Sequence, residues 1–395
     1  MPATNHDTTP DTMRDAMGGA RRDLVDEVCR RVADLPGTAA TLVRTEVDHL
    51  APLLTPEQRD ELVGEVLSRL TGLGELAAHL QDPDVDEVLV NAGGSVWLDR
   101  GGVLQRATTL RPGRVEQLLE RLLAPLGRRV DRSSPIVDAR LADGARVFAV
   151  LPPVAVDGPT LSVRRFAERI RPLTDFTDDI GIRLLTTILD AGCNIVVSGA
   201  TSSGKTSLVS ALVERLPPTE RLVIVEDTTE LAVAPSAHSV RLEARPASID
   251  GPPPIDLGAL VRTALRLRPD RIVVGEVRGD EVLALVQAMN TGHDGSIATL
   301  HANGPLDALF RLESLVLQAA PAWPLAAIRT QLARSIDVVV HVERCRQAGQ
   351  QRRVITEIHE VRDPGDDGVP ATRSLAHRDG SGRTLPTESL RRRRR

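Results

Sequence analysis

The stretch that decides the fold reads Gly199-Ala200-Thr201-Ser202-Ser203-Gly204-Lys205-Thr206, a Gly-x-x-x-x-Gly-Lys-Thr pattern. It follows an apolar run at 195–197 and precedes a helix-forming segment at 205–216. The two glycines allow the backbone to curl, so that several N–H groups point inward at phosphate oxygens. The amino end of the following helix adds its positive dipole. The pattern predicts a P-loop that binds a nucleoside triphosphate.

Lys205 carries unusual weight because it is the only lysine among the 49 basic residues of the chain. A compact ammonium suits the β- and γ-phosphates better than a planar guanidinium does. The hydroxyl of Thr206 is expected on Mg²⁺, and Ser207 extends the nucleotide-binding segment. We therefore predict ATP and Mg²⁺ as cofactors, although no motif for the base separates ATP from GTP. The alternative is a glycine-rich turn with an incidental lysine.

Regular alternation of strands and helices surrounds this loop. The predicted strands lie at 195–198, 222–226, 271–276, 296–300 and 337–342, and the predicted helices at 205–216, 256–268, 279–290, 305–319 and 324–334. Because the strands are apolar throughout and helices lie between them, the pattern predicts a mostly parallel sheet covered on both faces. This α/β domain is predicted to span 181–361.

The parts on either side of this domain have other patterns. Residues 1–20 are polar and are predicted to be disordered, and 21–75 show helical spacing of apolar residues. A small α+β domain is predicted at 76–166, followed by a hinge linker at 167–180. Its expected elements are strands at 85–90, 95–99, 145–151 and 160–164 and a helix at 114–126. After 361 the chain is polar and ends in five arginines, so 362–395 are predicted to be unstructured.

Composition excludes several classes of protein. The formal net charge is −5 and there is no tyrosine, so a general attraction to nucleic acid and a stacking surface for single strands are not expected. The three cysteines form no Cys-x-x-Cys pair, which favours a reduced, cytoplasmic setting. No apolar run approaches the ~18 residues of a membrane span. Any attachment to a membrane would therefore go through partner proteins.

Two acidic segments follow predicted strands, at the edge of the sheet where α/β proteins bind ligands. Glu276 closes the Walker B-like strand 272–276, in which Gly275 takes the usual aspartate position. The cluster Glu226-Asp227-Thr228-Thr229-Glu230 follows the strand 222–225. ATP hydrolysis needs carboxylates for the metal shell and for the attacking water. The alternative for the cluster is a solvated acidic loop.

Two histidines flank the predicted strand 296–300. His293 lies in a glycine-flanked loop before the strand and His301 lies at its far end. An imidazole placed in this way is a candidate for contact with a γ-phosphate, and the alternative is a capping or core histidine. Zinc is not expected, because no cysteine or further histidine accompanies them at ligand spacing.

Together these segments resemble the type II/type IV secretion ATPase superfamily, and most of all its tight-adherence (Flp) pilus assembly branch, the CpaF/TadA type. The most specific strings are Val-Gly-Glu-Val-Arg-Gly at 274–279 and Thr-Gly-His-Asp-Gly at 291–295. The resemblance covers roughly residues 80 to 361. It departs from the branch at 247–254, where a proline-rich loop replaces the usual asparagine and glycine-rich turn.

The resemblance implies a two-domain protomer in which a sensor-like N-terminal domain is hinged to a RecA-like ATPase domain, assembled as a hexameric homo-oligomer. It implies that Glu230 is the catalytic carboxylate and that Glu276 supports Mg²⁺ and water. Further residues are implied to contact the nucleotide or its phosphates. These are Arg146, Arg164, Glu226, Asp227, His293 and His301, with Arg140 and Arg278 as weaker candidates.

The implied function is a motor in which ATP-driven domain closure extrudes pilin or another protein through polytopic inner-membrane platform proteins. Two alternatives remain open. One is a RecA-like nucleic-acid motor or conjugative DNA-transfer ATPase, which the negative charge and the scarcity of aromatic residues disfavour. The other is a nucleotide-gated scaffold without catalysis, which Glu230, Glu276 and His293 disfavour.

Overall fold

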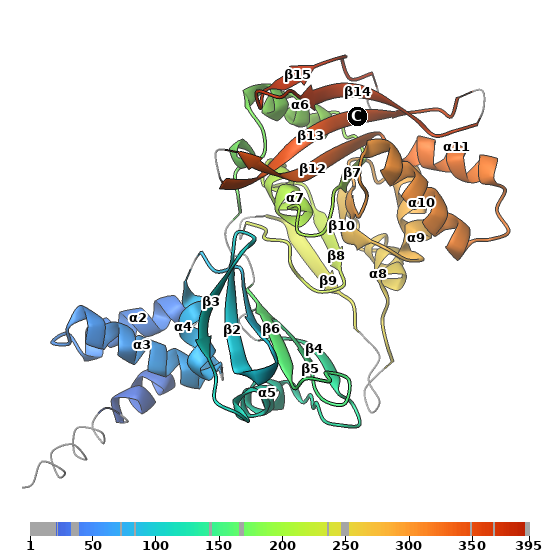
Figure 1. The fold of residues 1–395 in the computed structure, drawn as a ribbon. Helices are drawn as coiled ribbons and strands as arrows, with labels where there is room; N and C mark the ends of the chain where they lie inside the picture. Colours follow the sequence, from blue (N-terminus) through green and yellow to red (C-terminus); the bar gives the residue numbers. More distant parts are fainter. Residues whose placement is uncertain are drawn as a thin grey trace, which may run out of the picture. The chain divides into compact units, whose positions relative to one another are not determined.

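The computed structural model describes residues 21, 23–32, 39–71, 73–82, 84–141, 144–165, 170–234, 237–245, 253–347, 350–365 and 368–391. The predictions for 1–20, for most of the proline-rich loop and for the last four arginines therefore lie outside the described residues. The chain divides into two compact units, Met1–Phe166 and Ala167–Arg395 (Figure 1). We refer to them as the first and the second unit.

The first unit begins with helices, as the apolar spacing predicted. Helical residues 23–32, α2 (Ala39–Leu50) and α3 (Pro56–Thr71) share one apolar core. A capping box starts α3, because the Thr55 hydroxyl accepts from the Gln58 N–H at 3.3 Å and the Gln58 side chain accepts from the Thr55 N–H at 3.1 Å. Two short helices, η1 (Gly74–Leu76) and α4 (Ala77–Gln81), lead to the sheet.

A six-stranded antiparallel sheet forms the rest of the first unit, in the order β3-β2-β1-β6-β5-β4. The strands are β1 (Glu87–Val90), β2 (Ser95–Arg100), β3 (Val103–Thr109), β4 (Ile136–Arg140), β5 (Arg146–Val150) and β6 (Thr160–Arg164). Helix α5 (Arg114–Leu123) buries five apolar side chains in the same core as the inward residues of these strands. Strands β3 and β4 were not predicted. β3 lies at the sheet edge with every residue exposed, so it lacks the alternation that marks a half-buried strand.

The second unit is built on a nine-stranded sheet in the order β15-β14-β13-β12-β7-β11-β10-β8-β9. Six strands are parallel: β7 (Ile195–Ser198), β8 (Leu222–Glu226), β9 (Ser239–Glu243), β10 (Arg271–Val277), β11 (Ile297–Leu300) and β12 (Val338–Gln347). The antiparallel strands β13 (Gln350–Arg362), β14 (Ala371–Arg378) and β15 (Thr384–Pro386) extend the sheet beyond β12. The predicted fold class is confirmed, an α/β unit with a mostly parallel sheet preceded by an α+β unit.

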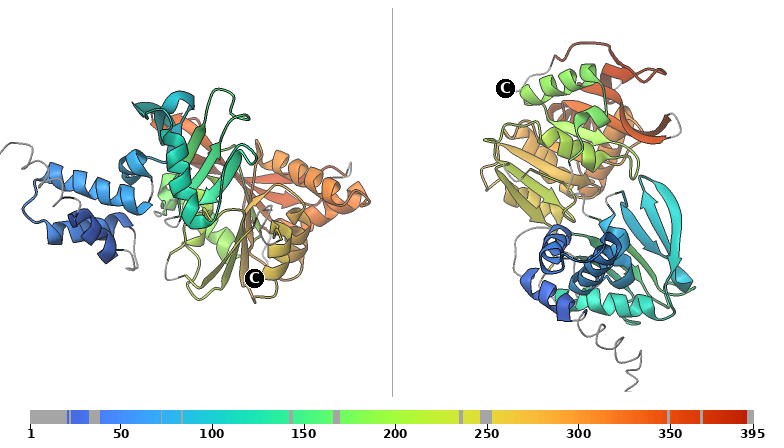
Figure 2. Two further views of the ribbon diagram at one scale, coloured as in Figure 1. Left: turned by 90° about the horizontal axis from the view of Figure 1, so that it is seen from below. Right: turned by 90° about the vertical axis from the view of Figure 1, so that its left-hand side faces the viewer.

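Helices cover both faces of this sheet, which explains the uniformly apolar strands (Figure 2). Ile195 and Val197 of β7 share a core with α6 (Asp179–Asp190) and α7 (Lys205–Val213). Val196 faces the opposite core. That core is formed with α8 (Leu257–Ala264), α9 (Glu281–Asn290), α10 (Pro305–Ala319) and α11 (Leu325–Ser335). Within the described ranges, no helix has the length and apolarity that a bilayer crossing requires.

Two boundary predictions need correction. The prediction of an unstructured segment from 362 is wrong, because β14 and β15 lie there. Leu375 is fully buried, and the Arg373 Nε donates to Glu360 on β13 at 3.1 Å. The predicted linker at 167–180 is also too long. Leu173 and Phe176 are buried in the second unit, and Phe176 accepts from the Ile355 N–H at 2.9 Å.

Candidate nucleotide-binding site

The glycine-rich loop joins the end of β7 to the start of α7, and both of its glycines are required by geometry. A Cβ on Gly199 would clash with the carbonyl oxygen of Val342 on β12. Gly204 has a φ of 103°, in the left-handed region that favours glycine. Ser202 also has a positive φ, of 59°. The backbone is therefore curled as the sequence pattern required.

Lys205 folds back over this loop. Its Nζ donates to the carbonyl oxygens of Gly199 and Ala200, both at 3.0 Å, and the residue is 9% exposed. Burial lowers the pKa of Lys205, while the nearby carboxylate of Glu276 opposes this shift. The Ser203 hydroxyl is buried in the same loop and has no hydrogen-bond partner among the described residues. Such an orphan hydroxyl is costly, and an oxygen-rich ligand would satisfy it.

The ionisation of Lys205 is directly measurable because the chain has one lysine. In protein labelled with ¹³Cε-lysine, we expect one resonance that titrates below the ordinary pKa of about 10.4. Mg-ATP should move this pKa upward, because phosphate charges stabilise the ammonium. Since the ammonium is the form that binds phosphate, affinity should fall as pH rises through the pKa of the free protein. A Lys205 pKa at the ordinary value, or one that Mg-ATP does not change, would contradict this assignment.

Glu276 lies on β10, the second neighbour of β7 in the sheet. It is partly buried, and its carboxylate favours the charged form of Lys205, which opposes the effect of burial on the lysine pKa. The Thr299 hydroxyl on β11 donates to the carbonyl oxygen of Gly275 at 2.5 Å and fixes the strand at this point. The structure thus brings together the loop lysine and the Walker B-like carboxylate.

Glu226 has a positioning task in the acidic cluster. It is 3% exposed, and its Oε1 accepts from the N–H groups of Glu230 and Leu231, each at 2.9 Å. Burial raises the pKa of Glu226, and these two N–H groups oppose the shift. A Cβ on Gly275 would lie 2.9 Å from the Glu226 Cγ. The glycine in place of the usual aspartate therefore makes room for Glu226, which in turn holds the loop that carries Glu230.

The other predicted polar residues of this edge are paired within the protein. Asp227 forms an ion pair with Arg278, which follows the neighbouring strand β10. The backbone N–H groups of Arg278 and Gly279 donate to the buried carboxylate of Glu281, at 2.5 and 2.8 Å. Glu281 was not predicted, and it shapes the turn after β10 in the way that a side-chain cap does.

The two histidines lie at opposite ends of strand β11. His301 follows β11 at the P-loop edge, where its Nδ1 lies 3.4 Å from the Thr201 hydroxyl. His293 precedes β11, and the two ends of this four-residue strand lie about 13 Å apart. The prediction that His293 joins the phosphate site of its own chain is therefore wrong. The two residues are close in the motif, but the strand between them carries them apart.

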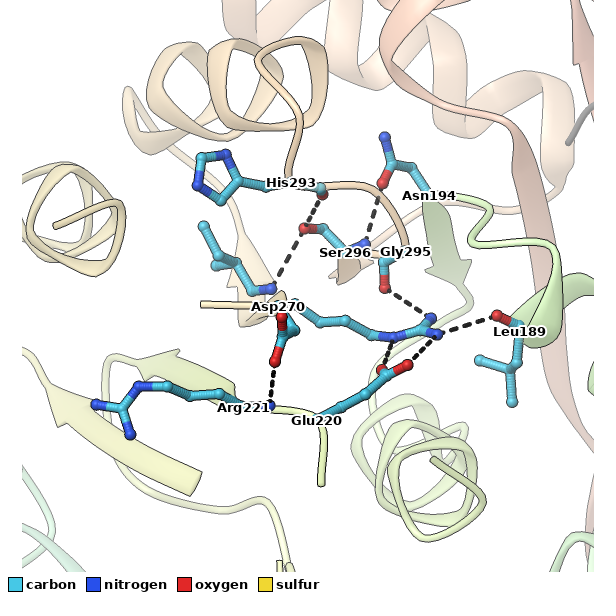
Figure 3. Close-up of polar contacts among 10 residues, drawn as sticks. Leu189, Asn194, Glu220, Arg221, Asp270, His293, Gly295 and Ser296 are labelled. Carbon is cyan, nitrogen blue, oxygen red and sulfur yellow. Dashed lines mark hydrogen bonds and ion pairs between the residues drawn. The ribbon is translucent and has the colours of Figure 1, made fainter. Parts of the chain in front are cut away.

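The His293 loop instead belongs to a polar cluster with Glu220 and Leu189 (Figure 3), which Arg271 joins through its hydrogen bonds. Arg271 is 2% exposed and donates to the Glu220 carboxylate at 2.5 Å and to the carbonyl oxygens of Leu189 and Gly295 at 3.1 and 3.3 Å. A Cβ on Gly295 would overlap the guanidinium. The Ser296 hydroxyl donates to the His293 carbonyl oxygen at 2.8 Å. Gly295 and Ser296, at the end of the Thr-Gly-His-Asp-Gly segment, thus have structural tasks.

The hairpin of β12 and β13 forms a wall beside the P-loop, which the sequence did not indicate. His341 on β12 bridges the Ser198 hydroxyl, at 2.9 Å, and the Glu343 carboxylate, at 3.3 Å. On β13, Arg353 packs against Gly204, and its Nη1 lies 3.4 Å from the Ser207 hydroxyl. The chain has 48 arginines, and no sequence pattern distinguished Arg353 from the others.

Three predicted arginines form one row on the sheet of the first unit. The strand register pairs Arg140 with Arg146 and Arg146 with Arg164, across β4, β5 and β6. Adjacent strands lie about 4.8 Å apart, so the three side chains are neighbours on one face. Asp138 binds Arg146 through two hydrogen bonds, at 2.9 and 2.5 Å. Glu87 on β1 continues the row beside Arg164, so the row combines three arginines with acidic neighbours.

Comparison with known proteins identifies one family. A protein-family model described as "Type II/IV secretion system protein" matches residues 70–391. A Mycobacterium tuberculosis protein whose name refers to conjugal transfer is 40% identical over 72% of this chain and 84% of its own length. The conjugal transfer protein TrbB of Rhizobium radiobacter is 34% identical, over 72% and 86%. The type IV secretion system protein PtlH of Bordetella pertussis is 32% identical, over 76% and 95%.

Solved structures agree on the fold. The ATPase DotB of Legionella pneumophila has a TM-score of 0.52 and 20% identity, over 73% of this chain and 80% of its own. The pilus retraction motor PilT has a TM-score of 0.52 and 19% identity, over 71% and 81%. At this level of identity the likeness concerns the arrangement of the chain.

Proposed function

Because the chain belongs to the type II/IV secretion system protein family, as its sequence predicted, we propose that it is an ATP-hydrolysing motor of a secretion or pilus-assembly machine. One observation carries the proposal. Lys205 is buried over a curled glycine loop, with the Glu276 charge nearby and beside the Ser203 hydroxyl, which finds no hydrogen-bond partner within the described ranges. This arrangement favours a bound triphosphate, whose oxygens would accept from both side chains.

The proposed division of tasks follows from these positions. Backbone N–H groups of 199–206 and the Lys205 ammonium bind the phosphates, with His301 beside them. Thr206 and Glu276 would hold Mg²⁺, which would supply positive charge to the phosphates. No group of three or more His, Cys, Asp or Glu suited to a metal occurs in the described part of the chain. The pair Thr206 and Glu276 fits Mg²⁺, because this ion keeps several waters in such sites and takes few ligands from the protein. Glu230, on the loop that Glu226 holds, would orient the attacking water.

Replacement of Glu276 tests catalysis directly. We expect Glu276→Gln to lower ATP turnover by about 10²–10⁴-fold, because a neutral amide supports Mg²⁺ and its bound water less well than a carboxylate does. Binding of Mg-ATP should persist. The matched control is Glu214→Gln, which makes the same charge change on an exposed residue after α7 and should leave turnover unchanged. Equally negligible rates in wild type and both variants would favour the nucleotide-gated scaffold instead.

The finer features of the motor are part of the proposal. We propose a ring of identical subunits, a hexamer in the family pattern, that acts on polytopic membrane proteins and through them on pilin or another protein substrate, as in the tight-adherence branch. The row of Arg140, Arg146 and Arg164 supports a role for the first unit in sensing nucleotide phosphates. Nucleotide-driven closure would then be the power stroke.

A second candidate has support in the names of the relatives. Two of them are assigned to conjugal transfer, so the motor of this chain could serve a DNA-transfer machine. The discriminating measurement is ATPase activity with single-stranded DNA and, separately, with membranes that contain the partner proteins. Stimulation by DNA would favour the second candidate, and stimulation by membranes alone would favour protein secretion or pilus assembly.

A further inference from the structure

The C-terminal hairpin brings a second cationic side chain to the P-loop. Arg353 lies on β13, and its Cδ fills the space beside Gly204, where an added Cβ would lie 2.6 Å away. Its Nη1 lies 3.4 Å from the hydroxyl of Ser207. Ser207 is the third residue of α7. The guanidinium therefore lies at the amino end of the helix whose N–H groups face the proposed phosphates.

A cation at this position is electrostatically unusual. The amino end of a helix carries a partial positive charge, so arginine and lysine stabilise the opposite end. Here the Lys205 ammonium and the Arg353 guanidinium both lie within the first turn of α7. Three sources of positive potential thus meet at one loop. The Glu276 carboxylate offsets part of this positive charge, and a polyanion in the loop would be attracted to the cationic groups.

Two features distinguish this position from a surface arginine. The loop that Arg353 contacts also holds the buried Ser203 hydroxyl, which has no partner in the part of the chain that the structure describes. In addition, the β12 backbone lies so close to Gly199 that a side chain there would clash with Val342. The hairpin therefore contacts both glycines of the P-loop and sets the place of Arg353 relative to it.

We propose that Arg353 is a nucleotide-binding residue that contacts the phosphate chain on the Ser207 side of the P-loop. The inference rests on the proposed function and adds a residue to the same site. Unlike Arg146 and Arg164, Arg353 belongs to the same compact unit as the loop. It would therefore bind nucleotide without any movement between the units. Its contribution should appear in the affinity for both ADP and ATP, and less in the rate of hydrolysis at saturation.

The test compares three variants by calorimetric titration with Mg-ATP and Mg-ADP. Arg353→Met keeps an apolar stem against Gly204 and removes the charge, and Arg353→Lys keeps the charge. Arg352→Met is the matched control, because Arg352 is exposed and the next residue on a strand points to the opposite face. We expect Arg353→Met to weaken both nucleotides by about 10- to 100-fold, as for loss of a charge-assisted hydrogen bond. Arg353→Lys should lose less, and Arg352→Met should bind as wild type.

Two results would overturn the inference. One is wild-type affinity in Arg353→Met. The other is an equal loss in Arg353→Met and Arg353→Lys, accompanied by an equal fall in thermal stability without nucleotide, since that pattern would make Arg353 a packing element of the loop. Failure of the wild-type protein to bind either nucleotide would instead refute the proposed function. The two failures are therefore distinguishable.

Discussion

Lys205→Ala protein is expected to fold and to lose ATP hydrolysis, with turnover lowered by at least about 10²–10³-fold. The substitution removes the ammonium that the loop carbonyls of Gly199 and Ala200 hold in place. No other lysine exists in the chain to replace it. Steady-state phosphate release by wild type and variant, at the same Mg-ATP concentration, measures the effect.

The same variant separates function from folding. Burial disfavours the charged form of Lys205, as its lowered pKa shows, so removal of the ammonium relieves a desolvation cost while two hydrogen bonds are lost. These effects oppose each other, and we expect the free energy of unfolding without nucleotide to change by less than about 1 kcal/mol. Mg-ATP should raise the melting temperature of wild type and leave that of the variant unchanged. Full turnover in Lys205→Ala would refute the P-loop assignment.

Lys205→Arg is an informative companion. It keeps the positive charge but replaces a compact ammonium by a planar fork, which two carbonyl oxygens at 3.0 Å do not accommodate in the same way. We expect it to be nearly as inactive as the alanine variant. If it were active, charge alone would suffice, and the single lysine of the chain would have no chemical explanation.

The local pattern sufficed to predict the parallel core of the second unit. Its strands are buried on both faces, so they read as continuous apolar runs, and the P-loop follows one of them as its glycines require. The capping box before α3 likewise joins two residues that are only three apart in the sequence. Features that depend on neighbours in sequence were therefore predictable.

The errors concern features that depend on distant residues. β14 and β15 are stabilised by contacts such as that between the hydroxyls of Thr177 and Thr384, at 3.0 Å, which no local pattern announces. His293 was assigned to the phosphate site by resemblance, although it precedes the predicted strand 296–300 and the phosphate site lies at the other end of that strand.

The Arg271 cluster at that opposite edge yields the largest expected effect on stability. Arg271→Ala would remove the guanidinium that donates to the Glu220 carboxylate and to the carbonyl oxygens of Leu189 and Gly295. Removal of one partner of a buried ion pair costs about 3–5 kcal/mol, because the other charge stays in a poorly solvated place. Urea unfolding of the variant should show a midpoint far below that of wild type. The matched control is Arg266→Ala, on an exposed residue just before β10, which should stay within about 0.5 kcal/mol.

A double variant identifies the cause of this loss. Arg271→Met combined with Glu220→Met removes both charges and leaves apolar side chains, so it should be less destabilised than Arg271→Ala. Because the cluster and the P-loop lie at opposite edges of the sheet, the folded fraction of each variant should bind Mg-ATP with wild-type affinity. An Arg271→Ala protein as stable as wild type would show that the cluster does not stabilise the fold. The Thr-Gly-His-Asp-Gly segment would then have no structural task there. Loss of ATP affinity in a stably folded double variant would instead show that the two edges are coupled, and His293 would then regain a place in the mechanism.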